Sequence, residues 1–265
     1  MRKTYRRQSN KDYWHKRWDD IPADLPMVNN EVYPLKYAEI TIKNKNGNIL
    51  EAGCGAGRIL RYYHENNYNI IGIDFIKVAI DKLKAIDNDL NVQVGNISDL
   101  QFKDSYFDYI LSFGLYHNLE NMADLENAIS ETHRVLKKEG LVCASFRADN
   151  LQTKITDWLT DRKDKKKYLN DTMLVFHKMN LTKSEYMNLF IKFGFEITFT
   201  EAVVNMPFLY KFSIFRSNNH KKFDENVARS EGYRLSWFGQ ILQNFLIRFF
   251  PNHFCNIYVL IAKKI

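Results

Sequence analysis

The feature that most constrains the fold is a regular alternation of short apolar segments and amphipathic segments between residues 48 and 146. The apolar segments predict buried strands at residues 48–52, 69–74, 92–94, 107–112 and 141–146. Between them, apolar residues recur at helical spacing, which predicts helices. Alternating strands and helices favour an α/β fold with a mostly parallel, doubly wound sheet that helices cover on both faces.

Further elements flank this alternation. A helix is predicted over residues 31–45, and another is expected to end at residues 138–140. The capping-box sequence Thr182-Lys183-Ser184-Glu185 begins a third helix, which Gly194 ends. Strands at residues 196–204 and 256–263 complete a seven-stranded sheet whose last strand is antiparallel.

The predicted strands also define a division of the chain. Residues 1–30 are expected to form an N-terminal arm or lid. The core is expected to comprise residues 31–204 and 254–265, and residues 205–253 an inserted subdomain that faces the substrate. Within the insert, Phe238, Ile241, Leu242, Phe245 and Phe249 lie at helical spacing. This spacing favours a helix that covers the core over one that lies on a membrane, because a membrane-surface helix usually carries more Lys and Arg.

Composition indicates a globular protein of the cytoplasm. Of 265 residues, 45% are hydrophobic and 26% charged, and 38 basic against 31 acidic residues give a net charge of +7. This excess permits an anionic substrate and does not require a nucleic acid. Three cysteines without a C-x-x-C pair predict neither a metal site nor disulfides. No secretory signal or membrane-spanning run is expected, and abundant Lys, Asn and Ile suggest an AT-rich bacterial genome.

Four motifs follow successive predicted strands, at the sheet edge where doubly wound folds bind ligands. The first, Glu51-Ala52-Gly53-Cys54-Gly55-Ala56-Gly57, has the spacing G-x-G-x-G. It differs from a dinucleotide-binding fingerprint, whose third glycine would replace Arg58, and from a phosphate-binding Walker loop. The second is Asp74, the third is the turn beginning Gly95-Asn96-Ile97, and the fourth is the strand at residues 107–112 with the His117 loop.

In this order, the four motifs resemble those of class I S-adenosylmethionine-dependent methyltransferases that act on small molecules. The resemblance covers residues 48–146 well and the two ends more loosely. It implies S-adenosylmethionine as the cofactor and no metal. It also implies cofactor contacts from Glu51, Ala52, Gly53, Cys54, Gly55, Asp74, Phe75, Asn96, Ile97 and Phe113. Asp74 would hold the ribose, and Asn96 stands where the family usually has Asp.

The same resemblance suggests where transfer occurs. His117 is the leading candidate for a base, with a structural histidine as the equal alternative, and the neighbouring Tyr116 is a second catalytic candidate. Candidate acceptor contacts come from the N-terminal arm, the end of the fifth strand and the basic insert. They are Tyr13, Trp14, Trp18, Arg147, Arg229 and Arg234.

The sequence favours methyl transfer to an oxygen or nitrogen atom of a small polar metabolite, such as a sugar or a phosphorylated intermediate of surface-glycan synthesis. Two alternatives remain. One is an RNA methyltransferase, although no Asn-Pro-Pro-Tyr motif, Pro-Cys nucleophile or RNA-binding module is evident. The other is a non-catalytic, cofactor-binding subunit of a partner protein. The sequence does not predict the oligomeric state.

Overall fold

The computed structural model describes residues 1–6, 9–20, 23, 25–167, 174–222 and 232–265. The chain divides into two compact units. Unit 1 comprises Met1–Arg147, Met173–Glu201 and Val259–Ile265, and unit 2 comprises Ala148–Thr172 and Ala202–Tyr258. Unit 2 therefore joins residues 148–172 to the segment that contains the predicted insert.

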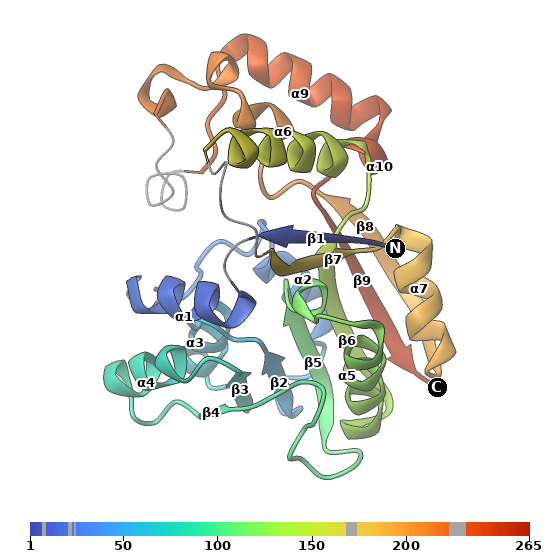
Figure 1. Ribbon diagram of the computed structural model, residues 1–265. Coiled ribbons are helices and arrows are strands. Elements are labelled where there is room, and N and C mark those ends of the chain that lie inside the picture. The colour runs from blue at the N-terminus through green and yellow to red at the C-terminus, as the bar shows by residue number, and fades with distance from the viewer. Residues whose placement is uncertain (7–8, 21–22, 24, 168–173, 223–231) are drawn as a thin grey trace. The chain divides into compact units, whose positions relative to one another are not determined.

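The centre of the fold is a seven-stranded sheet in the order β4-β3-β2-β5-β6-β9-β8 (Figure 1). Strands β4, β3, β2, β5 and β6 pair in parallel, whereas β9 runs antiparallel to its neighbours. The predicted α/β class, doubly wound sheet and antiparallel last strand are confirmed. The strands are β2 (Ile49–Ala52), β3 (Ile70–Asp74), β4 (Val92–Val94), β5 (Phe107–Phe113), β6 (Leu136–Arg147), β8 (Phe195–Val203) and β9 (Ile257–Lys264).

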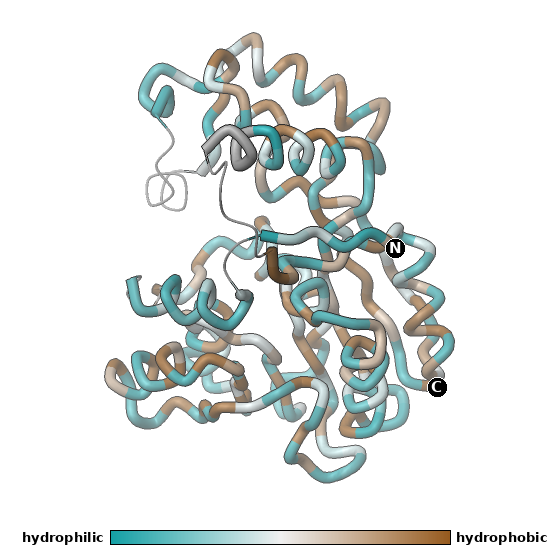
Figure 2. The backbone as a smooth tube through the Cα atoms, in the orientation of Figure 1, coloured by the Kyte–Doolittle hydropathy of each residue, from teal (hydrophilic) through white to brown (hydrophobic). Residues whose placement is uncertain are grey.

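The middle of this sheet forms the core of unit 1. Apolar residues follow the central strands in Figure 2. Side chains such as Leu50, Ile110 and Val142 are fully buried. Near-continuous apolar runs of this kind are typical of parallel strands covered on both faces.

Helices α2 (Leu35–Thr41), α3 (Arg58–Glu65), α4 (Lys77–Ile86), α5 (Met122–Val135) and α7 (Lys183–Lys192) surround the sheet. Helix α2 is shorter than the predicted helix at 31–45. Helix α7 begins with the predicted capping box, in which Thr182 and Glu185 each accept from the other's backbone amide.

Helix α5 ends earlier than the sequence predicts. Its last residue is Val135, and β6 begins at Leu136, which pairs with Phe107 of β5. Lys264 Nζ donates to the carbonyl oxygens of His133 and Leu136 at 2.7 Å each. Strand pairing and this ammonium thus satisfy backbone groups that a longer helix would have used itself.

The N-terminal arm contains a strand that the sequence did not predict. Strand β1 (Arg2–Arg6) pairs antiparallel with β7 (Val175–Asn180) in a separate two-stranded sheet. Helix α1 (Asn10–Asp20) follows. Asn10 Nδ2 donates to the carbonyl oxygen of Asn118 at 3.1 Å, which joins α1 to the loop after β5.

Unit 2 is built from helices and short turns. It contains α6 (Leu151–Lys167), α9 (Trp237–Phe249) and α10 (Pro251–Phe254), with the 3-10 turns Phe208–Lys211, Ser213–Phe215 and Asn218–His220. Buried Asn150 donates from Nδ2 to the carbonyl oxygen of Cys255 at 2.7 Å. Among the described helices, none combines the length and the apolar character that crossing a membrane requires.

Candidate active site

The glycine-rich motif forms a tight loop between β2 and α3. Gly53, Gly55 and Gly57 have positive φ values of 77°, 51° and 82°. A Cβ atom at Gly57 would lie 2.5 Å from Leu83 Cδ2. Glycine is therefore required both by the backbone conformation and by the close approach of α4. The loop turns at the carboxyl end of β2, as the motif predicts.

Helix α1 lies against this loop. A Cβ atom at Gly55 would be only 2.7 Å from Cζ2 of Trp18. Trp14 stacks on Trp18 with 5.6 Å between ring centroids. Lys82 of α4 fixes the end of α1 by donating from Nζ to the carbonyl oxygens of Trp18 and Asp19 at 2.7 and 2.6 Å. The two predicted arm tryptophans therefore lie at the glycine loop.

Tyr13, the third aromatic residue predicted in the arm, has a different neighbour. The Arg6 guanidinium lies 3.9 Å from the centroid of its ring. Tyr13 also meets Trp14 edge to face, with 5.1 Å between ring centroids. Tyr13 thus links β1 to the tryptophan pair.

Asp74, at the end of β3, holds the glycine loop and the start of α4 together. Its Oδ2 accepts from the Gly55 amide, and its Oδ1 accepts from the Ile76 amide, both at 2.9 Å. Burial raises the pKa of Asp74, and these two amides oppose that change. Each carboxylate oxygen has more than one lone pair, so this geometry leaves acceptor capacity for the hydroxyls of a ribose.

Phe75 follows Asp74 and presents an exposed ring. Its side chain is 55% exposed, and Lys11 Nζ of α1 lies 5.6 Å from the ring centroid. A large exposed aromatic ring next to the Asp74 carboxylate offers a flat surface on which a base can stack.

Asn96 and Ile97 form the turn after β4. Asn96 is exposed, and its Oδ1 accepts from the Ser98 amide at 3.0 Å. The Ile97 side chain is buried, which anchors the turn. Ser98 Oγ donates to the carbonyl oxygen of Asp124 at 3.1 Å and so joins the turn to α5. The Asn96 amide NH₂ adds donors that the Asp usual at this position lacks.

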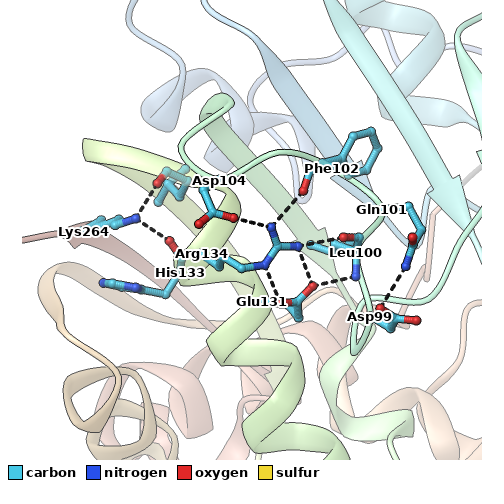
Figure 3. Close-up of polar contacts among 10 residues, drawn as sticks. Asp99, Leu100, Gln101, Phe102, Asp104, Glu131, His133, Arg134 and Lys264 are labelled. Atoms are coloured by element: carbon cyan, nitrogen blue, oxygen red, sulfur yellow. Dashed lines mark hydrogen bonds and ion pairs between the residues drawn. The ribbon is translucent and has the colours of Figure 1, made fainter.

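A cluster around Arg134 of α5 fixes the chain after this turn (Figure 3). The guanidinium donates to the carbonyl oxygens of Leu100 and Phe102 at 2.7 and 2.8 Å, and to Asp104 at 2.7 Å. Glu131 receives two further bonds from Arg134, and its Oε2 also accepts from the Leu100 amide at 2.7 Å. Charge-assisted bonds to several backbone groups hold residues 99–104 against α5.

The residues that begin the glycine motif are buried. Burial raises the pKa of Glu51 to about 8, and in the described part of the chain its buried Oε2 has no hydrogen-bond partner. Ala52 is fully buried at the end of β2. Cys54 is also buried, and burial raises its pKa well above 9.0, which does not favour a nucleophilic thiolate.

These observations test whether the site fits S-adenosylmethionine. The buried Glu51 carboxyl has an oxygen without a partner, and the methionine ammonium would supply a donor to it and would favour its ionised form. Asp74 and Phe75 fit an adenosine, and the close-packed glycines let the backbone approach the ligand. The residues present therefore fit the cofactor.

Two residues that the motifs did not reveal, Tyr33 and Arg58, belong to the same region. Tyr33 shares a hydrogen bond of 2.8 Å with Ser145 Oγ, and Ser145 Oγ also accepts from the Gly114 amide at 2.9 Å. Burial raises the pKa of Tyr33 to about 12, and the charge of Arg58 lowers it. Arg58 also lowers the pKa of Glu51, so its charge reaches both groups. Neither residue stands at a motif position, so no sequence signal marked them.

Phe113 ends β5 beside Tyr33. The two rings meet edge to face with 5.7 Å between their centroids. After Phe113, the loop contacts the glycine motif, because a Cβ atom at Gly53 would lie 3.3 Å from Leu115 Cδ2. The ends of β2 and β5 therefore meet, through Leu115 of the loop that continues to His117.

His117 lies in the 3-10 turn Tyr116–Asn118. Its side chain is buried, and no described residue forms a hydrogen bond with its buried Nδ1. Burial lowers the pKa of His117 well below 6.5, and Arg147, Lys178 and His177 lower it further. The imidazole is therefore neutral at physiological pH, with a nitrogen able to accept a proton.

Tyr116 points in another direction. It is fully buried, its hydroxyl shares a hydrogen bond of 2.9 Å with Thr132 Oγ1, and its ring packs edge to face on Phe190. Burial raises the pKa of Tyr116 to about 12. These contacts place the side chain in the core between α5 and α7.

The predicted acceptor residues are not all brought together. Arg147 ends β6, half-buried, and its charge acts on His117. Arg234 is exposed in unit 2, and Arg229 lies outside the described residues. Arg216, another basic residue of the insert, donates from Nε to the carbonyl oxygen of Tyr210 at 2.7 Å and so supports the local fold.

A doubly wound sheet whose second and third strands end in a glycine loop and a buried aspartate is the architecture of a Rossmann-like α/β protein. Residues 50–144 match the model of the methyltransferase domain family. An uncharacterised methyltransferase of Schizosaccharomyces pombe is 30% identical over 107 residues, which cover 39% of this chain and 74% of that protein. The chain belongs to the class I S-adenosylmethionine-dependent methyltransferases and uses S-adenosylmethionine.

Two further comparisons agree with this family. The ubiquinone/menaquinone biosynthesis C-methyltransferase UbiE of Rickettsia prowazekii is 33% identical over 119 residues, which cover 40% of this chain and 46% of that enzyme. The chain thus spans about half the length of UbiE. The crystal structure of a methyltransferase from Methanosarcina mazei has the same fold, with a TM-score of 0.59 and 19% identity over 88% of this chain and 98% of that one.

Proposed function

We propose that the enzyme methylates an oxygen or nitrogen atom of a small polar acceptor in the cytoplasm. A sugar or a phosphorylated intermediate of surface-glycan synthesis is the acceptor class to test first. The observation that carries this proposal is the buried, neutral His117 in the loop that contacts the glycine motif. Three buried free thiols, those of Cys54, Cys143 and Cys255, suit a reducing compartment.

Distinct roles toward the cofactor are proposed for the residues around the glycine loop. Asp74 would accept hydrogen bonds from the ribose, Phe75 would stack on the adenine, and the Asn96–Ile97 turn would border its edge. Glu51 would face the methionine ammonium, and Arg58 would face its carboxylate. Trp18 would cover the glycine loop and exclude water from the sulfonium end.

His117 would act on the acceptor's proton. S-Adenosylmethionine, when bound, supplies an electrophilic methyl group, which the acceptor's lone pair takes as the carbon–sulfur bond breaks. His117 Nδ1 would receive the proton that the acceptor oxygen or nitrogen loses. The nearby positive charge of Arg147 would then favour release of that proton and would attract an anionic acceptor.

Formation of S-adenosylhomocysteine tests this proposal. The purified enzyme is incubated with S-adenosylmethionine and separate pools of nucleotide sugars, sugar phosphates, polar amines and tRNA, and the methylated product is identified by mass spectrometry. The Asp74→Asn variant is the control, because it removes the carboxylate that holds the loop. Turnover with a small polar pool alone supports the proposal.

Other outcomes separate the alternatives. Turnover with tRNA alone, weakened by salt, would instead identify an RNA methyltransferase. Tight binding of S-adenosylhomocysteine in calorimetry without turnover of any pool would favour the non-catalytic, cofactor-binding subunit. Either result would reject a small polar acceptor.

A further inference from the structure

Helix α9 of unit 2 exposes large apolar side chains and buries a glycine and a polar residue, which is the reverse of the usual amphipathic helix. Its fully buried residues are Gly239 and Gln243, whereas Trp237 and Phe238 are 80% and 59% exposed. The expectation that this helix covers the core with its aromatic face is therefore wrong. The apolar residues at helical spacing are mostly on the outer face.

Specific contacts fix this orientation. A Cβ atom at Gly239 would lie 2.6 Å from the carbonyl oxygen of Phe215, so only glycine lets the helix approach so closely. Gln243 Oε1 accepts from the Leu209 amide at 3.1 Å, which satisfies a buried backbone donor. Ser236 begins the helix by accepting from the Gly239 amide at 3.2 Å.

The exposed apolar residues lie on one side of α9, in an arc that also contains the exposed Arg248. At 100° per residue, they occupy about a third of the helix circumference. They are Trp237, Phe238, Ile241, Phe245 and Phe249, each at least 48% exposed. Phe250, 46% exposed, extends the arc at the helix end. An exposed apolar surface of this kind marks an interaction site.

The segment that contains the arc is mostly basic. Its sequence, residues 202–258, has seven Lys and Arg against three Asp and Glu. The exposed basic residues of this segment are Lys211, Lys221, Lys222, Arg234 and Arg248. Arg248 lies on α9 itself, and Arg234 precedes the helix by three positions. The sequence of helix α6 in the same unit has three Asp against six Lys and Arg.

We propose that the exposed arc of α9 binds the surface of a membrane that contains anionic phospholipid. Aromatic and aliphatic side chains on one face of a helix insert at the boundary of headgroups and acyl chains, and flanking Lys and Arg attract anionic headgroups. A second copy of this chain fits less well, because a symmetric contact opposes the same patch on both copies and would therefore bring two mostly basic segments together. This binding is independent of the identity of the methyl acceptor.

Vesicle binding tests the proposal directly. The full-length protein is sedimented with vesicles of phosphatidylcholine alone or with about a third phosphatidylglycerol. We expect binding to the anionic vesicles, which falls as salt increases. The Ile241→Gln/Phe245→Gln variant should bind about tenfold or more weakly. The affinity of the Arg234→Gln/Arg248→Gln variant for anionic vesicles should fall about fivefold for each charge removed.

A matched control separates the arc from exposed apolar residues in general. Ile86→Gln/Ile191→Gln replaces two helical isoleucines of unit 1 that are 51% and 53% exposed. This variant should bind as the unchanged protein does. Circular dichroism and thermal unfolding establish that all variants are folded.

Three results would overturn the proposal. The first is no sedimentation of the unchanged protein with anionic vesicles. The second is an equal loss of binding in the arc variant and in the Ile86/Ile191 control. The third is a dimer in light scattering that the Ile241/Phe245 changes dissociate, without any vesicle binding, because the arc would then contact a second copy.

Discussion

The indole of Trp18 lies directly over Gly55, so close that a single added Cβ atom would be 2.7 Å from Cζ2. Gly55 is also held by Asp74, whose Oδ2 accepts from its amide at 2.9 Å. The arm, the glycine loop and the Asp74 carboxylate therefore meet at one residue. A change at this residue acts on all three.

Gly55→Ala should weaken cofactor binding. A residue with a side chain at a φ of +51° costs about 1–2 kcal/mol, and the contact with Trp18 adds to this cost. We expect an affinity for S-adenosylhomocysteine about tenfold lower by calorimetry. The double variant Trp18→Ala/Gly55→Ala should recover part of the loss if the ring is the obstacle. Binding of Gly55→Ala equal to that of the unchanged protein would contradict this geometry.

Glu51 should make the stability of the cofactor-free protein depend on pH. Its folded-state pKa of about 8 lies above the ordinary 4.5. The neutral form is favoured by folding, so this contribution is complete below about pH 4.5 and is lost as the pH rises through about 8. Thermal unfolding of Glu51→Gln should depend less on pH across that window. A Glu51→Gln curve parallel to that of the unchanged protein would show that the carboxyl is not buried.

His117→Gln should slow transfer without weakening cofactor binding. Loss of a positioned base costs about 10²- to 10⁴-fold in rate. Because burial lowers the pKa of His117 well below 6.5, the unchanged enzyme should keep its rate through neutral pH and lose it only at a pH well below 6.5. Single-turnover rates of the unchanged enzyme and of His117→Gln, measured across pH, give both the rate loss and the pH dependence.

Tyr116→Phe is the matched control for that experiment. It removes the hydroxyl that bonds to Thr132, so it should cost about 1 kcal/mol of stability and leave the transfer rate unchanged. Equal slowing of transfer by both variants would show that the whole turn Tyr116–Asn118, rather than the imidazole, supports the reaction.

Arg134→Met should loosen the chain that follows the adenine turn. The change leaves Glu131 and several backbone carbonyls without a charged donor, at a cost of about 1–3 kcal/mol. We expect a lower Tm, faster proteolysis at residues 99–104 and weaker cofactor binding.

Lys192→Met provides the comparison for Arg134→Met. It removes an exposed pair with Glu126 of 2.8 Å and should cost less than about 0.5 kcal/mol. Similar losses in the two variants would show that the Arg134 cluster contributes no more than an ordinary surface pair.

Local sequence signals predicted the elements that carry the cofactor site. The glycine loop, Asp74 and the turn at Asn96 lie at the ends of β2, β3 and β4 as predicted. Their order follows from topology, since the carboxyl ends of parallel strands meet at one edge of the sheet. The cofactor-binding roles of the individual residues stay predictions until a complex is measured.

Residues outside the motifs could not be placed in this way. Tyr33 reaches Ser145 and Trp18 reaches Gly55 across long separations in sequence, without any periodic signal. His117 and Tyr116 are neighbours in a 3-10 turn, where successive side chains point about 120° apart. Their spacing therefore gives no indication of which one faces the core.

The sequence by itself determined the doubly wound sheet, the family and the position of the cofactor loop, because strand periodicity, glycine spacing and caps act over a few residues. Only the tertiary structure decided which side of α9 is covered. An apolar stripe shows that a helix has an apolar side, but the buried side depends on what packs against it. Here Gly239 permits a close backbone contact and Gln243 satisfies a buried amide, so the aromatic side faces outward.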